Sequence, residues 1–338
     1  MESILRFAAR TACKLPAPIL KRLSGPTIEI DGQTLDPLVQ FLVRNFADKP
    51  GDVGTVESTR HSFDTQGTWM DFPHHPSVKA QRGSFDGPAG GIPYEMYRPK
   101  GLPAKDAPVM VFYHGGGHTG GSIKSHAGAC RELARRADIA VVSVEYRLAP
   151  EHRFPVGIDD CLAAYDAVFA QADTLGIDRA RIAVGGDSAG ANVAAVLAQQ
   201  RKDAPHPPAY QILWVPWVDM SKQTRSYDLF DVGFFLEKPK MEWYIDNYLA
   251  APEDAMHPKA SPILGDVSGV CPAALLIAGF DPLRDEGVAY GEKLKAAGVA
   301  TDVKVYDTLV HPFVNVAGCV PAAAAAFDDA VGLLRENL

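Results

Sequence analysis

Cysteine is scarce in this chain, with five residues among 338. Their number is odd, their spacing is wide, and they form neither a CxxC pair nor the Cys/His cluster of a zinc site. The neighbouring histidines His74 and His75 also lack further spaced ligands. The sequence therefore predicts no metal site, no disulfide scaffold, and reduced thiols in a cytoplasmic protein.

Long basic runs and long apolar runs are missing as well. The net charge is −8, from 41 acidic and 33 basic residues, so nucleic acid is not an expected partner. No apolar stretch reaches the length of a membrane span. Residues 1–23 mix apolar side chains with five basic ones, which argues against a signal peptide and predicts an amphipathic cap helix. Peripheral membrane contact by this segment stays open.

The composition is that of an ordinary globular protein, 47% hydrophobic and 22% charged. Short β-branched runs alternate with longer helical patterns, which predicts one α/β domain over residues 1–338, with a mostly parallel sheet covered by helices on both faces. The near-continuous apolar character of the strands is typical of burial on both faces. The expected strands are 109–113, 139–144, 181–185, 211–215, 274–278 and 302–306, and the expected helices are 127–137, 157–172, 189–201, 284–297 and 321–334.

Three segments stand outside this alternation. Residues 77–85 and 92–98 predict a hairpin at the edge of the sheet, joined by a turn-rich stretch. Residues 1 to about 50 and about 216–260 fit no strand–helix unit, and the second segment is rich in aromatic residues. Because open α/β sheets bind ligands at the carboxyl ends of their strands, these two segments are predicted to form a cap over that edge.

The strongest local motif is the GxSxG turn GDSAG at 186–190, which lies between an expected strand and an expected helix. A serine at such a turn projects its hydroxyl from the backbone, and small flanking residues relieve the crowding there. The N-terminus of the following helix favours developing negative charge. Ser188 is therefore the predicted nucleophile.

A serine hydroxyl requires a nearby base, and that base requires an acidic residue to orient it. In an α/β sheet of this kind the chain order is serine, then aspartate or glutamate, then histidine. Asp281 directly follows the expected strand 274–278, and His311 follows the strand 302–306 and is the only histidine after Asp281. The other candidates, interpreted as structural, are His206, His257, Asp285 and Glu286.

Glycines 115–117 follow the expected strand 109–113 and would let backbone N–H groups approach the oxyanion of a tetrahedral intermediate. The amide of Ala189, next to the nucleophile, would complete this oxyanion hole. The glycine loop lacks the lysine and Ser/Thr of a P-loop and does not match GxGxxG, so no nucleotide cofactor is expected. His114 is interpreted as a residue that holds the loop by hydrogen bonding.

Taken together, HGGG at 114–117, GDSAG at 186–190, DPLRDEG at 281–287 and His311 resemble the hormone-sensitive-lipase-like branch of the α/β hydrolases, also called bacterial lipolytic family IV. The segments EYRLAPEH at 145–152 and GPAG at 87–90 extend the resemblance over nearly the whole chain. Two departures stand out. Pro312 follows the histidine where the family usually has glycine, and Ala191 replaces a second glycine after GDSAG.

The resemblance implies a role for each matched residue, the α/β-hydrolase fold with a helical cap, and no cofactor. It also implies cleavage of short- to medium-chain acyl esters, and it leaves a homodimer through the last strand and helix open. The implied roles are Ser188 as nucleophile, His311 as base and then acid, Asp281 as the residue that orients it, and the amides of Gly116, Gly117 and Ala189 as the oxyanion hole.

We expect a serine carboxylester hydrolase that acts on a small-molecule ester through an acyl-enzyme. Two alternatives remain at this stage. A noncatalytic hydrolase-like protein could bind a small molecule, and an amidase could use the same triad, since the difference lies in leaving-group protonation and pocket shape. Five cap aromatics are candidates either for an acyl pocket or for the core of the cap. These are Trp217, Phe234, Phe235, Trp243 and Tyr244.

Overall fold

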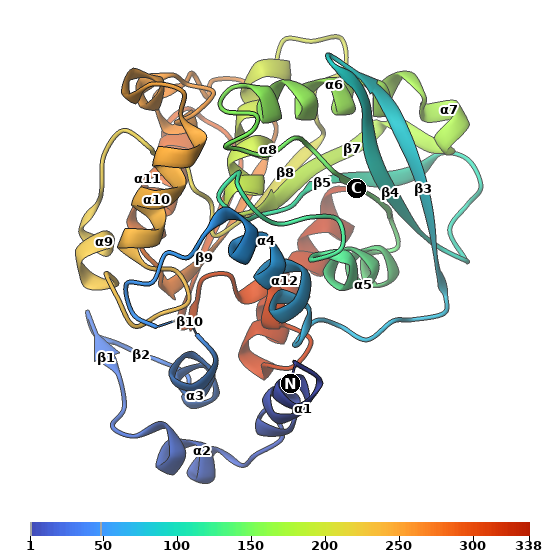
Figure 1. Ribbon diagram of the computed structural model, residues 1–338. Helices are drawn as coiled ribbons and strands as arrows, with labels where there is room; N and C mark the ends of the chain where they lie inside the picture. Colours follow the sequence, from blue (N-terminus) through green and yellow to red (C-terminus); the bar gives the residue numbers. More distant parts are fainter. Residues whose placement is uncertain (1, 48) are drawn as a thin grey trace.

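The computed structural model describes residues 2–47 and 49–338, and its centre is a sheet of eight strands (Figure 1). These strands are β3 (Val78–Gly87), β4 (Gly90–Pro99), β5 (Ala107–Tyr113), β6 (Ala140–Val144), β7 (Ile177–Asp187), β8 (Tyr210–Trp214), β9 (Ala273–Phe280) and β10 (Thr301–Val310). Their order is β10-β9-β8-β7-β5-β6-β4-β3. All pairs from β10 to β6 are parallel, whereas β4 is antiparallel to both β6 and β3. The predicted mostly parallel sheet with an edge hairpin is thus confirmed.

Helices cover both faces of this sheet, because successive side chains along a strand point to opposite faces and both sets here are apolar. Phe112 and Leu276 belong to one core cluster, whereas their neighbours Val111 and Ile277 belong to the other. The first cluster is covered by α5 (Ala127–Ala137) and α12 (Pro321–Asn337). The second is covered by α6 (Val156–Ala170), α7 (Ala172–Leu175), α8 (Ala189–Arg201) and α11 (Arg284–Ala296). The helix expected at 157–172 divides into α6 and the short α7.

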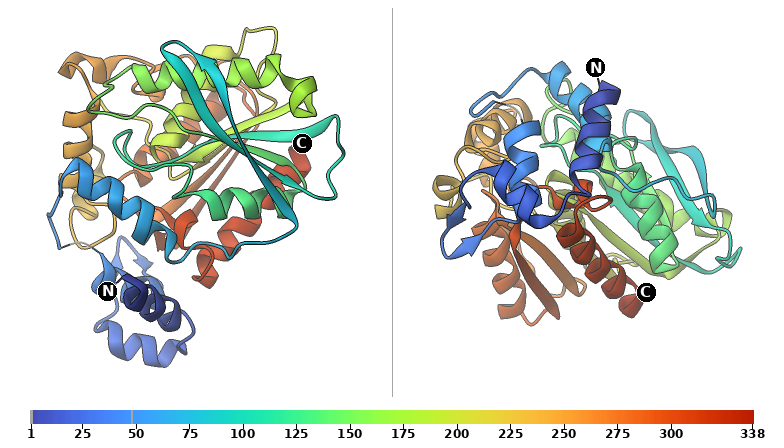
Figure 2. Two further views of the ribbon diagram at one scale, coloured as in Figure 1. Left: turned by 45° about the vertical axis from the view of Figure 1, so that its right-hand side comes forward. Right: turned by 90° about the horizontal axis from the view of Figure 1, so that it is seen from below.

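The N-terminal segment forms helices outside these layers. They are α1 (Glu2–Ala12), α2 (Ala17–Ser24), α3 (Pro37–Phe46), α4 (Val56–Thr65) and the 3₁₀ turn η1 (Gln66–Thr68), with the small ribbon β1 (Glu29–Ile30) and β2 (Gln33–Thr34). Figure 2 shows α1, α2 and α3 as a group at one end of the molecule. Arg10 at the end of α1 donates to the Trp69 carbonyl at 3.0 Å and to the Asp71 carbonyl at 3.3 Å. These contacts fix α1 to the body.

A second segment outside the layers connects β8 to β9. It contains α9 (Arg225–Leu229), α10 (Lys238–Tyr248) and the 3₁₀ turns η2 (Pro252–Met256) and η3 (Pro262–Leu264). Its own core includes Trp217, Met241 and Tyr248, which pack with Phe154 from the loop before α6. A last 3₁₀ turn, η4 (Phe313–Val316), precedes α12. Within the described ranges, no helix combines the length and apolarity needed to cross a bilayer.

Candidate active site

Ser188 occupies the turn between β7 and α8, with φ 56° and ψ −117°. A positive φ is costly for a residue with a side chain, and such strain is typical of nucleophile turns. The glycines two residues away on either side have a steric reason: a Cβ on Gly186 or Gly190 would collide with the Tyr113 carbonyl oxygen on β5. The amide of Ser188 donates to the Trp214 carbonyl at 2.9 Å, which joins the turn to β8.

The structure brings Asp281 and His311 together from the ends of adjacent strands. Asp281 follows β9, His311 follows β10, and His311 Nδ1 lies 2.8 Å from Asp281 Oδ2. Asp281 Oδ1 accepts from the Leu283 amide at 2.9 Å. Because an ionised carboxylate only accepts hydrogen bonds, Nδ1 carries the proton and Nε2 is left as the basic nitrogen. Both side chains are almost fully buried.

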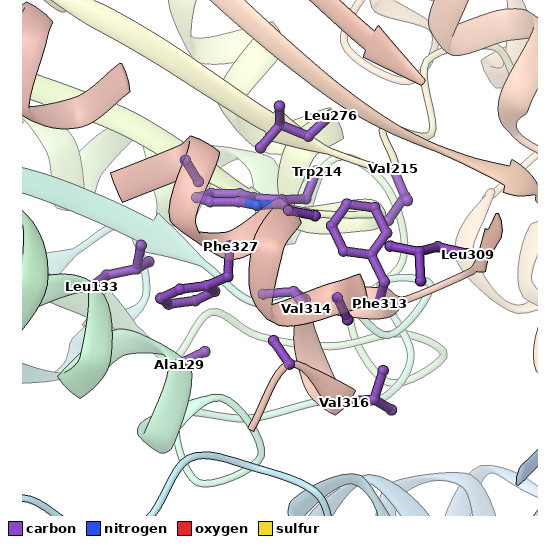
Figure 3. Close-up of a cluster of buried hydrophobic side chains, with 14 of the residues drawn as sticks. Ala129, Leu133, Trp214, Val215, Leu276, Leu309, Phe313, Val314, Val316 and Phe327 are labelled. Atoms are coloured by element: carbon purple, nitrogen blue, oxygen red, sulfur yellow. The ribbon is translucent and has the colours of Figure 1, made fainter. Parts of the chain in front are cut away.

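Pro312 does not prevent this contact, and the His311–Pro312 peptide is cis. The chain on both sides of His311 is anchored in the core through Leu309, Val310, Phe313 and Val314, each about 1% exposed. Figure 3 shows Leu309, Phe313 and Val314 in the same cluster as Trp214, Leu276 and Phe327. Hydrophobic packing on both flanks therefore fixes the position of the imidazole loop.

The neighbouring acids of the DPLRDEG segment point elsewhere. Asp285 contacts the Arg284 guanidinium at 2.9 Å and accepts from the Ser226 amide at 3.0 Å. Glu286 is fully buried, accepts from the amides of Val218 at 2.7 Å and Asp219 at 3.0 Å, and has a pKa raised well above its usual range by burial. These contacts tie α11 to the chain that leaves β8.

The other two candidate histidines also have structural contacts. The His206 ring stacks on Phe169 with centroids 3.9 Å apart, and His257 packs against Phe154 at 5.5 Å. Neither ring is found among the described residues that line the cavity beside Ser188.

The glycine loop after β5 places Gly116 and Gly117 in the same cavity as Ser188. Both have positive φ, 121° and 60°, which a residue with a Cβ rarely adopts. A Cβ on Gly117 would also collide with the Tyr244 ring of α10. Among the described residues, no acceptor is found for the amide of Gly116 or Gly117. The amide of Ala189, the first residue of α8, likewise has no partner inside its helix. Three backbone donors are thus available near Ser188.

His114, at the start of the glycine loop, stabilises this loop through its contacts with Gly115 and Tyr146. Its Nδ1 lies 2.9 Å from the Gly115 carbonyl, and its ring stacks on Tyr146 with centroids 4.4 Å apart. The Tyr146 hydroxyl donates to the His114 carbonyl at 2.6 Å. Burial lowers the pKa of His114 to about 4, so the ring is neutral at physiological pH.

A cavity of ≈ 220 Å³ opens in front of Ser188, His311, Gly116 and Gly117. Its walls are mostly apolar and come from both segments outside the layers. The N-terminal segment supplies Phe46, Phe63, Trp69 and Met70, and the β8–β9 segment supplies Phe234, Phe235, Leu236 and Tyr244. Of the five candidate aromatics, Phe234, Phe235 and Tyr244 line the cavity, whereas Trp217 is buried in the core of the β8–β9 segment and Trp243 packs against that core.

The two segments are tied to each other above the cavity by the first turn of α10. Glu237 accepts from the Gly51 amide at 2.7 Å and from the Gly233 amide at 2.6 Å. Lys240 donates to Thr59 Oγ1 at 2.7 Å and lies over the Trp243 ring, 4.1 Å from its centroid. These contacts hold residues 51–59 and α4 against the wall of the cavity.

The buried His118 is expected to make the stability of the fold depend on pH. Its ring is buried and stacks on Tyr248 at 3.9 Å, and burial lowers its pKa to about 3. The pKa of a histidine in an unfolded chain is near 6.5, so between about pH 6.5 and pH 3 the unfolded chain binds a proton that the native state does not bind. Stability is therefore lost as the pH falls through this range. Between pH 7 and pH 4.5 the free energy of unfolding should fall in both proteins. We expect this fall to be about 2 to 3 kcal/mol smaller in His118→Phe than in the wild type.

Urea unfolding at the two pH values measures this difference. The exposed histidine His74 supplies the control, and His74→Gln should keep the wild-type dependence on pH. An equal loss of stability in His118→Phe and the wild type would contradict the account of His118.

Sequence reasoning missed two parts of the site. Residues lining the cavity continue to Met70, past the segment that ends at about 50, because α4 carries Thr59 and Phe63. It also missed the contact between Asp187 Oδ1 and His126 Nε2, which are 3.1 Å apart. Asp187 stands inside the GDSAG motif, directly before Ser188, and that position was the available signal. Nothing local marks His126.

A mostly parallel eight-stranded sheet, with a strained serine turn and a His–Asp pair at the carboxyl ends of its strands, defines an α/β hydrolase. The chain belongs to the alpha/beta hydrolase fold family, whose model matches residues 110–315. It is 38% identical over 350 residues to the carboxylic ester hydrolase LipN of Mycobacterium tuberculosis, covering 96% of this chain and 89% of that one. It is 38% identical over 253 residues to an ethyl acetate hydrolase of Pseudomonas putida, covering 73% and 79%.

Comparison with solved structures gives the same family. An ester hydrolase from the metagenome of Lake Arreo, complexed with a bipyridine phosphonate derivative, superposes with a TM-score of 0.84 at 36% identity, covering 89% of this chain and 98% of that one. The resemblance to the hormone-sensitive-lipase-like branch is therefore confirmed, and the chain is a carboxylic ester hydrolase.

Proposed function

We propose that the chain hydrolyses short- to medium-chain acyl esters through an acyl-enzyme on Ser188. The observation that carries this proposal is the shared cavity: Ser188 and His311 line it together, and His311 is hydrogen-bonded to Asp281. The free amides of Gly116 and Gly117 line the same space. Nucleophile, oriented base and oxyanion donors therefore meet in one place.

In the first half of the reaction Ser188 Oγ attacks the acyl carbon while His311 Nε2 takes the hydroxyl proton. Asp281 stabilises the imidazolium through Nδ1–H. The carbonyl oxygen becomes an oxyanion held by the amides of Gly116, Gly117 and Ala189, a contribution of about 2.7 to 4 kcal/mol for one donor. The C–O bond to the alcohol then breaks as His311 returns the proton to the leaving oxygen.

In the second half His311 removes a proton from water, and the hydroxide attacks the acyl carbon of the ester on Ser188. Collapse of the second tetrahedral intermediate breaks the bond to Ser188 Oγ, which regains its proton from His311. The carboxylic acid leaves, and the site is restored. No cofactor takes part in the proposed cycle.

The acyl chain is proposed to lie in the apolar cavity beneath α4 and α10. A volume of ≈ 220 Å³ is below the roughly 300 to 1,000 Å³ of sites for drug-sized ligands, which supports a short or medium chain. The similarity to an ethyl acetate hydrolase supports the same choice.

A series of p-nitrophenyl esters from acetate to palmitate tests this function. We expect kcat/KM to be highest among the short and medium chains and to fall sharply at palmitate, because the longest chain does not fit a cavity of ≈ 220 Å³. A maximum at palmitate would contradict the proposed pocket. The matching amide series separates ester from amide preference, and we expect the esters to react far faster.

We propose that residues 1 to about 50 and about 216–260 form the cap, a role supported by the wall residues Phe46, Phe234 and Phe235. The exposed apolar side chains Phe7, Ile19 and Leu23 lie among basic residues of α1 and α2, which supports peripheral contact with an anionic membrane surface. Co-sedimentation with anionic vesicles, against neutral vesicles as a control, tests this contact.

We also propose a homodimer through β10 and α12. It is supported by the position of β10 at the edge of the sheet, where the part before Thr308 can pair with another strand; the Thr308 carbonyl itself accepts from the Asp36 amide at 3.0 Å. Sedimentation of the full chain tests it: a monomer at micromolar concentration contradicts it. A cytoplasmic location remains our proposal from the odd number and wide spacing of the cysteines.

A further inference from the structure

A buried carboxylate lies beside the proposed oxyanion hole, among the residues that line the cavity. Asp187 precedes the nucleophile and is only 2% exposed. Its Oδ1 accepts from the Gly115 amide at 2.9 Å, and a Cβ on Gly115 would collide with the carboxylate. One side chain therefore connects the nucleophile turn after β7 to the glycine loop after β5.

The partner of this carboxylate is His126, whose side chain is fully buried at the start of α5. His126 Nε2 lies 3.1 Å from Asp187 Oδ1 and 3.3 Å from Oδ2. Since the carboxylate can only accept, Nε2 carries a proton. Burial alone disfavours both charges, but the pair outweighs it: the pKa of His126 is raised and that of Asp187 is lowered. The other charged or titratable groups near His126 include His114, with ring centroids 5.9 Å apart, and the carboxylates of Asp71 and Glu145.

The network continues from His126 to the wall of the cavity. His126 Nδ1 lies 2.9 Å from Ser125 Oγ, which accepts from the Ser122 amide at 2.9 Å. Ser122 Oγ donates to Asp64 Oδ1 at 2.6 Å. Asp64 belongs to α4, the helix that carries Thr59 and Phe63 into the cavity. One hydrogen-bond network thus connects the glycine loop, the nucleophile turn and α4.

The negative charge of Asp187 makes this hydrogen-bond network matter for the reaction. An unpaired carboxylate buried next to the nucleophile would repel the negative charge that develops on the substrate oxygen, and buried charges interact strongly because the local dielectric is low. A positive partner removes this repulsion. It also keeps Asp187 in place against the amide that begins the glycine loop.

We propose that His126 is a positioning residue for ester hydrolysis: it neutralises Asp187 and holds it against Gly115, so that the glycine loop keeps its oxyanion-binding form. This inference rests on the proposed function of Ser188. It predicts that His126 acts on kcat and leaves substrate binding in the cavity unchanged, because His126 does not line the cavity.

Four variants separate charge neutralisation from a structural role. His126→Leu removes the positive partner of Asp187 and leaves only its hydrogen bond from the Gly115 amide. We expect kcat to fall about 100-fold or more, as for loss of one oxyanion donor, with KM within about twofold. His126→Gln keeps a donor without the charge and should lie between His126→Leu and the wild type. Asp187→Asn keeps an acceptor for Gly115 without the charge and should lose little. The double variant Asp187→Asn/His126→Gln pairs two neutral amides and should recover most of the kcat lost in His126→Gln.

His206→Gln is the matched control, since His206 Nε2 also lies near an aspartate, 3.5 Å from Asp166, but away from the cavity. It should keep wild-type kinetics. The rate of Ser188 labelling by a fluorophosphonate supplies a second readout. It should fall in His126→Leu by a factor similar to that of kcat, because the phosphonyl oxygen occupies the same oxyanion hole.

Three results would overturn the inference: wild-type kcat in folded His126→Leu, a rise in KM at constant kcat, or a double variant as slow as His126→Gln. If the His126 variants fail to fold, nitrogen NMR of the wild-type imidazole at pH 7 decides, since a neutral His126 ring contradicts neutralisation of Asp187. If any of these results is found while the wild type still hydrolyses esters in a way that depends on Ser188, the role of His126 is rejected and the proposed function is kept.

Discussion

Replacing Ser188 with alanine is expected to lower kcat for a short-chain p-nitrophenyl ester by about a million-fold. The variant keeps the cavity and the oxyanion donors, so substrate still binds, but no acyl-enzyme forms. The melting temperature should change little, because removing one hydroxyl adds no buried unpaired group. Steady-state kinetics and thermal unfolding of the same preparation measure both quantities.

Ser268→Ala is the control for this substitution, since Ser268 is exposed on the loop before β9. It should keep wild-type kcat. Activity of Ser188→Ala within about tenfold of the wild type, in a preparation free of contaminating esterase, would place the nucleophile elsewhere and contradict the proposed mechanism.

Asp281→Asn is expected to lower kcat by about ten-thousand-fold at neutral pH. Asp281 accepts a hydrogen bond from His311 Nδ1 at 2.8 Å, which leaves Nε2 free to act as the proposed base. An asparagine that donates to Nδ1 instead fixes the other tautomer, in which Nε2 carries the proton and cannot take one from Ser188. The loss should appear in kcat, with KM nearly unchanged.

Asp285→Asn provides the matched comparison, because Asp285 lies four residues further along and contacts Arg284 and the Ser226 amide. We expect it to keep most of the activity and to lose some stability. Equal losses in the two variants, or a larger loss in Asp285→Asn, would contradict the assignment of Asp281.

The parts of the molecule that could be predicted from the sequence are those with local causes. The GDSAG turn is recognisable because Gly186 and Gly190 must both pass the Tyr113 carbonyl, so no other residue fits. Gly116 and Gly117 are recognisable because residues with a side chain rarely adopt their positive φ, and a Cβ on Gly117 would also collide with the Tyr244 ring. The central strands β5, β6, β8 and β9 are recognisable because both of their faces are buried and their residues are nearly all apolar. The predicted strands 181–185 and 302–306 overlap β7 and β10, but β7 begins four residues earlier and β10 ends four residues later, where their side chains are more polar or more exposed.

The parts that could not be predicted depend on contacts between distant residues. His126 meets Asp187 across 61 residues, and the sequence around His126 resembles any helix start. The role of α4 depends on Lys240 reaching Thr59 from α10, a contact that no local pattern indicates. Pro312 is the opposite case: the sequence shows it as a departure from the family directly after His311, and the packing of Leu309 and Phe313 in the core fixes the position of the imidazole loop.

The most direct test of the account is covalent labelling by a fluorophosphonate, followed by intact mass measurement and peptide mapping of the full chain. The account predicts one phosphonyl group per chain, carried by Ser188, and no labelling of Ser188→Ala. Labelling of another residue, or an unmodified Ser188 in a chain that still hydrolyses esters, would contradict it.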